Sequence, residues 1–410
     1  MAEAKRRSRK RKLLLSLFGI ILGLLMTEVL LRVVGYSAPL FYMPDYYRGV
    51  ALRPNVSGTY QREGRNSISI NSAGLRDREH SIAKPANTIR IALLGDSYCE
   101  ALQVPMEQTF WWLLQQRLES CSQFEGKHVE LINFGVSGFG SGQELITLQQ
   151  KVWDYSPDIV MLLVTTNNDI SDNMRSLKNT NEIPYFIRQG DQLVVDNSFR
   201  DSAAFRWHSS GLNRAGVWFR DNLRTIQLIY EIHLLIRTKL DERRARQQAP
   251  PQIPGPSDEK RQAAPEITVE NMIYREPRDP TWNEAWRVTE DLIKEIHNEV
   301  NQKGAKFVLV IGSNPIQVHP DRSVRDRFKS YLGVDSLFYP NQRLAQFSDH
   351  EQIDFLDLAK PMQTYADQNK VFLHGFGKEI GNGHWNADGH RVAAELIAAK
   401  MCSGQATTSK

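Results

Sequence analysis

The stretch Gly95-Asp96-Ser97 holds a serine at the place where a buried strand is expected to end. The run before it, 88–94, is apolar and branched enough for a strand that is covered on both faces. Ser97 would then stand at the carboxyl end of a central strand, the edge at which open α/β sheets bind ligands. A hydroxyl presented there can serve as a nucleophile, whereas the structural alternative is that Asp96 and Ser97 only cap the next helix.

Three later loops offer what an acyl-transfer serine needs, which is a base and donors for an oxyanion. The glycine-rich run 133–142 contains Gly138, where backbone N–H groups can approach a ligand. The run Thr165 to Asp169 offers the side-chain amide of Asn168, and a C-terminal loop carries His384. Each run taken alone is also compatible with a structural turn, so their order along the chain carries the argument.

An alternation of strands and helices places these loops at one edge of a sheet. Apolar runs predict strands at 88–94, 129–133, 158–165, 306–311 and 354–358, with helices at 109–120, 143–155, 281–300 and 388–402. Thr281 and Glu284 have the spacing of a capping box at the start of the third helix. The pattern predicts a three-layer α/β/α sandwich around a five-stranded parallel sheet in flavodoxin-like order.

Two segments fall outside this alternation. Residues 35–87 are expected to form a juxtamembrane segment with one or two short strands and no evident chemistry. Residues 170–280 interrupt the main domain, 88–402, with a helix at 221–240 and a polar, proline-rich stretch at 241–268 that indicates a flexible surface insertion. Residues 403–410 form a short tail.

The N-terminus is basic and then apolar. The formal net charge is +4, but seven basic residues against Glu3 give residues 1–12 a charge of +6, so the remainder carries −2 and is no general polyanion binder. Residues 13–34 reach about 33 Å as a helix, enough for a hydrocarbon core of about 30 Å. Glu28 and Arg32 lie four residues apart and can pair near the far end.

We therefore expect a signal anchor, with residues 1–12 in the cytoplasm and the rest of the chain periplasmic or extracytoplasmic. A cleaved signal peptide is the alternative, and a nucleic-acid-binding basic cluster is disfavoured. Three cysteines, Cys99, Cys121 and Cys402, are read as buried apolar residues, although one disulfide is compatible with an oxidising compartment. No ligand cluster calls for a metal or another cofactor.

The order of the motifs resembles that of the SGNH or GDSL hydrolase family over residues 88–180 and 281–402. The resemblance implies that Ser97 is the nucleophile and His384 the general base. It also implies an oxyanion hole formed by the backbone N–H groups of Ser97 and Gly138 and by the side-chain amide of Asn168.

Two positions depart from the pattern of the family. Thr166 replaces the glycine of a Gly-x-Asn-Asp block and is expected to narrow the pocket. The aspartate that usually precedes the histidine by two or three residues is replaced by Asn382 and Gly381. Since such an aspartate fixes the imidazole tautomer and stabilises the imidazolium, a Ser-His dyad remains, oriented by a backbone carbonyl, Asn382 or Glu379.

The resemblance and the expected location outside the membrane imply a serine esterase acting on O-acyl, especially O-acetyl, groups of cell-envelope or extracellular glycans. Two alternatives are an O-acetyltransferase that uses the same Ser-His site and a non-catalytic glycan-binding or scaffold member of an envelope assembly. Expected partners are the membrane, the acylated glycan and other polysaccharide-modifying proteins. Trp111, Trp112 and Trp385 could stack on sugar, with core packing as the alternative for the first two.

Overall fold

A computed structural model describes residues 2–190, 192–248 and 269–403 of the chain. The chain divides into two compact units. The helical unit comprises the described parts of Met1–Leu40, Ser57–Thr59 and Ser209–Ala263, and the α/β unit comprises those of Phe41–Val56, Tyr60–His208 and Ala264–Lys410.

The α/β unit is built around a parallel sheet of five strands in the order β11-β10-β7-β5-β6. The strands are β5 (Thr88–Leu94), β6 (His128–Asn133), β7 (Ile159–Val164), β10 (Lys306–Ile311) and β11 (Asp354–Asp357). This is the flavodoxin-like order, with the first strand of the sheet beside the second and the third. The predicted fold class and its five strands are confirmed.

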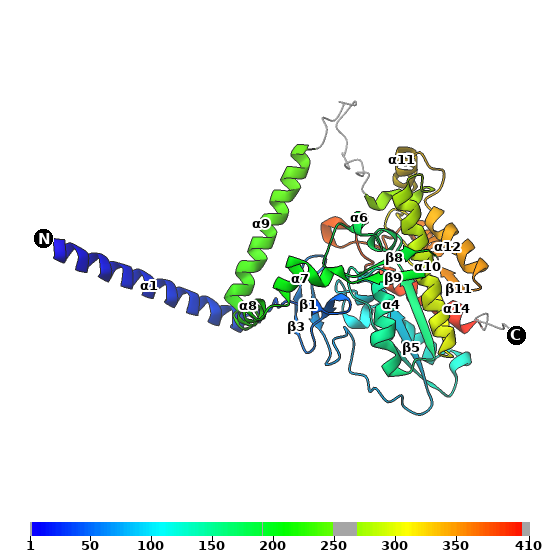
Figure 1. Cartoon of the computed structure of the whole chain (residues 1–410), viewed down its shortest axis with the longest axis horizontal. Helices are drawn as coiled ribbons and strands as arrows, with labels where there is room; N and C mark the ends of the chain where they lie inside the picture. The colour runs from blue at the N-terminus through cyan, green and yellow to red at the C-terminus, as the bar shows by residue number, and fades with distance from the viewer. Residues whose placement is uncertain (1, 191, 249–268, 404–410) are drawn as a thin grey trace. The chain divides into compact units, whose positions relative to one another are not determined.

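Helices cover both faces of this sheet (Figure 1). Alternate strand residues enter different cores: Leu94 and Leu162 pack in one, and Leu93 and Leu163 in the other. The first core is closed by α4 (Ser141–Gln150) and α10 (Pro280–Gln302), and the second by α3 (Phe110–Glu119), α13 (Ala359–Asn369) and α14 (Ala387–Cys402). The apolar strands are therefore buried on both sides, which is why they read as continuous apolar runs.

The other elements of the α/β unit are short or lie between the sheet strands. The described strands and longer helices among them are β1 (Tyr42–Asp45), β2 (Gly49–Leu52), β4 (Asn66–Ser69), β8 (Tyr185–Gln189), β9 (Gln192–Asp196), α11 (Arg322–Leu332) and α12 (Tyr339–His350). Strand β3 (Ser57–Tyr60) pairs with β4, but its residues Ser57–Thr59 belong to the helical unit. The short helices are α2 (Ser97–Glu100), α5 (Asp169–Asp172), α6 (Arg175–Lys178), α7 (Ala203–His208), η1 (Met106–Gln108), η2 (Ser122–Phe124), η3 (Val152–Tyr155), η4 (Ser198–Asp201), η5 (Val269–Tyr274) and η6 (Gly377–Glu379).

The structure corrects several element boundaries. Asp279, not Thr281, caps α10, because its side chain accepts the N–H of Trp282 and Pro280 takes the first helical position. The helix expected at 143–155 ends at Gln150 and continues as η3, and α11 to α13 were not predicted. Residues 35–87 form four short strands instead of one or two.

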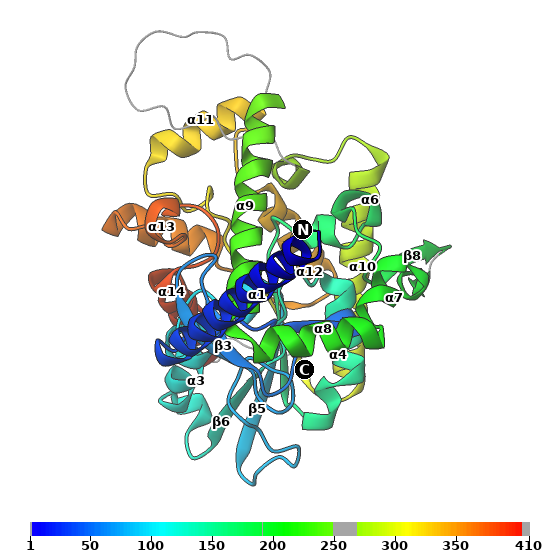
Figure 2. The same cartoon turned by 90° about the vertical axis from the view of Figure 1, so that its left-hand side faces the viewer.

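The described part of the helical unit contains three helices. They are α1 (Ala2–Val33), α8 (Gly211–Asn222) and α9 (Arg224–Gln248), and both views show them meeting at the C-terminal end of α1 (Figures 1 and 2). The single helix expected at 221–240 is thus two, with a break at Leu223. Because α9 continues to Gln248, the flexible insertion predicted from residue 241 is wrong for 241–248, and 249–268 lie outside the described residues.

The apolar part of α1 fits a membrane span. Lys10–Val33 is 24 residues long with a mean hydropathy of 2.4, which makes it the one candidate span among the described residues. Glu28 and Arg32 form the expected ion pair at 2.8 Å. Length and composition are equally compatible with a signal sequence.

Two of the three cysteines are bonded to each other. Cys121, after α3, and Cys402, at the end of α14, form a disulfide across 281 residues, with Cα atoms 5.8 Å apart. The single disulfide that the sequence left open is therefore present between these two cysteines, whereas Cys99 is free and buried. The bridge closes the core between α3 and α14 at the chain terminus.

Candidate active site

Ser97 stands directly beyond the carboxyl end of β5, in a turn that both caps a helix and brings the Ser97 hydroxyl to an imidazole. Asp96 is the cap of α2, since its side chain accepts the N–H of Tyr98 at 2.9 Å. The hydroxyl of Ser97 is not used for capping and lies 2.8 Å from Nε2 of His384. The turn therefore presents Ser97 to a base while Asp96 secures the backbone.

His384 is oriented by Glu63, which comes from the loop between β3 and β4. Oε2 of Glu63 lies 2.5 Å from Nδ1 of His384, and Oε1 accepts the backbone N–H of the same residue at 2.7 Å. This carboxylate places the imidazole proton on Nδ1, so that Nε2 is free to accept the proton of Ser97. Ser97, His384 and Glu63 therefore form a complete hydrogen-bonded triad, with the imidazole between the hydroxyl and the carboxylate.

The residue that orients the imidazole is Glu63, and not Asn382 or Glu379 as the sequence suggested. Glu379 is exposed in η6, and Asn382 is exposed at the rim of the pocket; neither is hydrogen-bonded to the imidazole. The carboxylate instead arrives from a position 321 residues earlier in the chain. No local signal marks Glu63, because a glutamate beside a glycine in a polar loop is indistinguishable from any surface residue.

Gly383 makes this approach possible. Its φ is +76°, and a Cβ atom there would lie 2.2 Å from Oε1 of Glu63. Its carbonyl is held from below by the buried His374, whose Nδ1 lies 2.8 Å away and whose Nε2 lies 3.0 Å from the hydroxyl of Ser313. The indole of Trp385 donates to the same hydroxyl at 2.9 Å, so the loop that carries His384 is fixed by a buried network.

The charges around the base shift its pKa. Burial alone would lower the pKa of His384, but the hydrogen bond and negative charge of Glu63 outweigh it, so this pKa is raised. Burial would raise the pKa of Glu63, yet the hydrogen bonds from His384 hold it below its ordinary value. The pKa of His374 is lowered to about 3 by burial, so this histidine is a neutral support.

Asn168 reaches the same edge from the end of β7. Its Nδ2 lies 3.2 Å from Oδ2 of Asp96 and 3.4 Å from carboxylate oxygens of Asp169 and Asp172. Asp96 also accepts the hydroxyl of Thr165 at 3.2 Å. Acceptors on three sides orient this amide, and the amide lines the same pocket as Ser97 and His384.

Behind Asn168 lies a group of buried acids, Asp96, Asp169 and Glu144. Burial raises the pKa of each of the three carboxyl groups. Repulsion from neighbouring carboxylates adds to the rise for Asp169 and Glu144, whose pKa values lie well above the ordinary value, whereas hydrogen bonds to Asp96 partly oppose the rise of its pKa. Neither carboxyl oxygen of Glu144 has a hydrogen-bond partner among the described residues. Because Asp96 and Asp169 accept hydrogen bonds and Glu144 accepts none among the described residues, the charged form of Glu144 is the least stabilised of the three.

Gly138 lies in the exposed turn after β6, with a φ of +78°. The preceding N–H, of Ser137, donates to the buried carboxylate of Glu100 at 2.5 Å, and the carbonyl of Gly138 accepts the ammonium of Lys178 at 2.7 Å. The turn is thus fixed on both sides of Gly138. Gly138 is not among the residues that line the pocket around Ser97, whereas Asn168 and His384 are.

A pocket of about 460 Å³ opens over the triad. Its lining is uncharged apart from His384, with four amide side chains besides Asn168, those of Asn167, Asn271, Asn314 and Asn382. Thr166 does not narrow it: its hydroxyl is buried and accepts the amide of Asn314 at 3.1 Å. Trp111 and Trp385 are fully buried, so neither offers a face to a sugar.

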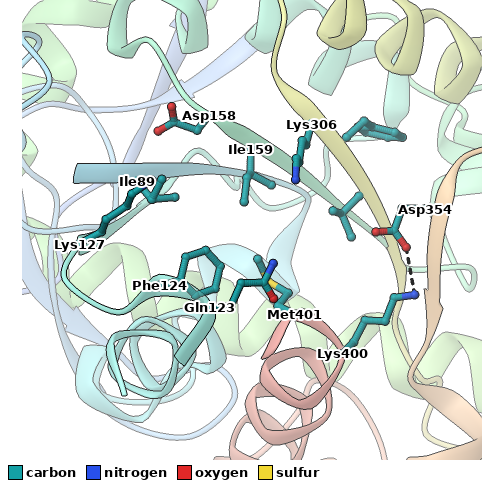
Figure 3. Close-up of a pocket in the computed structure, with 12 residues that line it drawn as sticks. Ile89, Gln123, Phe124, Lys127, Asp158, Ile159, Lys306, Asp354, Lys400 and Met401 are labelled. Atoms are coloured by element: carbon teal, nitrogen blue, oxygen red, sulfur yellow. Dashed lines mark ion pairs between the residues drawn. The ribbon is translucent and has the colours of Figure 1, made fainter. Parts of the chain in front are cut away.

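A second pocket, of about 220 Å³, lies at the opposite, amino edge of the same sheet (Figure 3). Its wall is apolar, with Ile159, Phe124 and Met401, and Lys127, Lys306 and Lys400 stand around it. No group of three or more potential metal ligands occurs among the described residues. Among the residues that line this pocket, no hydrogen-bonded series of side chains like that of Ser97, His384 and Glu63 is present.

Comparison with known proteins finds similarity in structure alone. No family profile and no curated protein matches the chain. Similar solved structures include an α/β hydrolase from the metagenome of Lake Arreo, Spain, with 12% identity, a TM-score of 0.37 and coverage of 78% of this chain and 97% of that chain. A G-D-S-L family protein from Desulfitobacterium hafniense has 12% identity, a TM-score of 0.34 and coverage of 76% and 98%.

An acetylxylan esterase variant from Geobacillus stearothermophilus is similar at 10% identity, with a TM-score of 0.36 and coverage of 77% of this chain and 94% of that chain.

Proposed function

We propose that this protein is a serine esterase of the SGNH or GDSL type that acts on O-acyl, chiefly O-acetyl, groups of cell-envelope or extracellular glycans. The proposal rests on one observation, the hydrogen-bonded series from Ser97 through His384 to Glu63. A serine beside an oriented imidazole at the carboxyl edge of a sheet is the arrangement that activates a hydroxyl for acyl transfer.

The reaction proceeds in two steps. Nε2 of His384 takes the proton of Ser97 as Oγ attacks the ester carbonyl, and Glu63 stabilises the imidazolium that forms. The backbone N–H groups of Ser97 and Gly138 and the amide of Asn168 are the donors we assign to the oxyanion. His384 returns the proton to the leaving alcohol, and water then attacks the acyl-serine to release the carboxylic acid.

The character of the pocket supports an uncharged, hydroxyl-rich substrate. Five asparagine side chains line it, and amides donate to and accept from sugar hydroxyls, while no lysine or arginine is available for an anionic group. The apolar helix α1 supports a location at a membrane, and the basic residues before it favour a cytoplasmic N-terminus with the α/β unit outside. A glycan of the envelope meets both conditions.

The decisive experiment measures p-nitrophenyl acetate hydrolysis and fluorophosphonate labelling of the full chain in detergent. We expect labelling of the wild type and its loss in Ser97→Ala, with turnover reduced about 10⁵-fold or more. Labelling of the Ser97→Ala variant at the wild-type rate would refute the assignment of the nucleophile.

Release of acetate from acetylated glycans, compared with appearance of acetyl groups on an added glycan acceptor, separates hydrolysis from transfer. Transfer uses the same three residues and differs only in the hydroxyl that enters the second step. A non-catalytic scaffold was suggested chiefly by the missing carboxylate. Because Glu63 supplies a carboxylate to His384, that reason no longer applies.

A further inference from the structure

The junction between α8 and α9 is bound to the outer part of α1 by its two charged residues. The carboxylate of Glu28 accepts the backbone N–H groups of Arg224 and Thr225 at 3.1 and 2.9 Å and the hydroxyl of Thr225 at 2.9 Å. Arg32 donates to the carbonyl of Asn222 at 2.6 Å. An acidic side chain thus caps the start of α9, where the helix dipole favours it, and an arginine meets the end of α8.

The segment that follows α1 strengthens this junction. The N–H of Ala38 donates to the buried amide of Gln227 at 2.8 Å, and Arg224 donates to the hydroxyl of Ser37 at 2.8 Å. Arg220 of α8 lies over the ring of Tyr230 of α9 at 3.6 Å. α8 and α9 are therefore parts of one helical unit with α1, and the depth of α1 in a membrane determines theirs.

That depth follows from helix geometry. Lys12 is the last basic residue before the apolar run and marks the near boundary of the hydrocarbon core. A core of about 30 Å takes about 20 helical residues, so its far boundary lies near Arg32. Glu28 then lies about 6 Å inside that boundary. The start of α9, which Glu28 binds, is consequently at the level where acyl chains meet headgroups.

Large apolar side chains of this unit face away from it. On α8, Leu212, Trp218 and Phe219 are 70%, 59% and 53% exposed, whereas Arg220 on the other side packs against α9. On α9, Ile229 and other aliphatic residues continue the exposed surface. The hydrocarbon-length part of α1 is likewise uncovered. Such a continuous apolar surface in water is unfavourable, and aromatic side chains of this kind favour a membrane interface.

We propose that α8 and the first turns of α9 form a second membrane contact, with Leu212, Trp218 and Phe219 inserted at the interface of the lipid bilayer that α1 spans. Arg214 of α8 is also exposed, and its long side chain can keep the guanidinium at the level of the lipid phosphates. The bilayer is the occupant because the exposed apolar helix α1 belongs to the same unit and the hydrogen bonds of Glu28 fix the level of the start of α9 relative to it. The proposal requires α1 to remain as an anchor and does not depend on the esterase activity.

The test uses the full chain in lipid nanodiscs made of phosphatidylcholine and phosphatidylglycerol. Phe219→Cys is labelled with an environment-sensitive nitrobenzoxadiazole dye, and Arg214→Cys in the same helix is the matched control. The native cysteines do not compete, since Cys121 and Cys402 are bonded and Cys99 is buried. Hydrolysis of p-nitrophenyl acetate and helical circular dichroism verify that both variants are folded.

With nitroxide-bearing lipids, we expect the label at 219 to be quenched at least about threefold more than the label at 214, and its emission to be shifted to the blue. Equal quenching at both positions, or none at 219, would overturn the proposal. It would also be overturned if the signal at 219 depended on the number of protein copies per nanodisc and not on the nitroxide lipid, because a second copy would then cover this surface. Leu212→Ser with Phe219→Ser, read through a label at Ala215→Cys, should reduce lipid quenching by at least about half.

Discussion

The two edges of the central sheet are both hollowed, and they differ in what surrounds the hollow. At the carboxyl edge, Ser97, His384 and Glu63 are joined by hydrogen bonds, and each fixes the next. At the amino edge, Lys400 forms a partly exposed salt bridge with Asp354 at 3.1 Å (Figure 3). Asp158 forms another with Lys84 at 2.7 Å. Exposed ion pairs contribute little to stability and orient nothing. We therefore expect catalysis at the carboxyl edge, where the polar groups are hydrogen-bonded in series, and not at the amino edge, where only a cavity is present.

The difference arises from the topology of parallel strands. Every strand delivers the next residues of the chain to the carboxyl edge, which is how Ser97 after β5 and Asn168 after β7 come to share a pocket. At the amino edge the chain enters each strand, and Lys127 before β6 and Lys306 at the first position of β10 are exposed residues. Substitutions at the two edges should accordingly differ in effect by orders of magnitude.

The largest effect after the loss of Ser97 is expected for Glu63→Gln. An amide at this position can no longer stabilise the imidazolium and can favour the wrong tautomer of His384, so kcat should fall by about 10³ to 10⁴. The matched control is Glu379→Gln, which alters an exposed carboxylate on the same loop as His384 and should leave kcat within about twofold. Steady-state kinetics with p-nitrophenyl acetate measures both; retention of more than about a tenth of the wild-type kcat by Glu63→Gln would show that Glu63 does not orient the base.

The pH profile gives an independent reading of the same pair. The general base must be neutral, and Glu63 raises the pKa of His384 above 6.5, so wild-type kcat/KM should decline as pH falls through that raised pKa. Without the carboxylate this pKa falls, and the acidic limb of the Glu63→Gln profile should move to lower pH. An unmoved limb would assign the titration to another group.

A smaller effect is expected for Asn168→Ala. Removal of one oxyanion donor typically lowers kcat by about 10² to 10³ with little change in KM, because the interaction strengthens only in the transition state. Asn167→Ala, its neighbour in the same pocket lining, should cost less than about tenfold. Equal losses in the two variants would mean that Asn168 acts only through packing.

Glu144→Gln should affect stability more than activity. Burial and the charge of Asp96 raise the pKa of Glu144 well above 4.5 in the folded state. Stability contributed by a group with a raised pKa is fully present below its unfolded pKa and is lost as pH rises, because the unfolded chain then ionises and the folded one resists. Urea unfolding should therefore show the variant to be more stable than wild type by about 1 kcal/mol or more near pH 8, and equal to it near pH 4.

The smallest effects are expected at the amino edge. Lys127→Ala and Lys306→Ala remove exposed charges beside the second pocket, and we expect kcat within about twofold and free energy of unfolding within about 0.5 kcal/mol of wild type. The same kinetic and urea measurements check this. A tenfold loss of kcat in either variant would show that the two edges are coupled and would remove the basis of the comparison.

The sequence alone determined the features that depend on neighbouring residues. The buried strands were readable because each is covered on both faces and so is apolar throughout, as in 88–94 and 159–164. Their order along the chain placed Ser97, Asn168 and His384 at one edge, because each follows a strand or opens a helix. The apolar length of α1 and the pair of Glu28 with Arg32 were equally local, being set by composition and a spacing of four residues.

Only the tertiary structure decided which distant residues complete each site. Glu63 meets His384 across 321 residues, Cys121 meets Cys402 across 281, and Glu28 caps a helix that begins at Arg224. The residues next to each of these in the sequence do not predict which distant residue it contacts. A hydrogen bond, a disulfide or an ion pair needs two groups within a few ångströms, and that proximity is created by the packing of the whole chain.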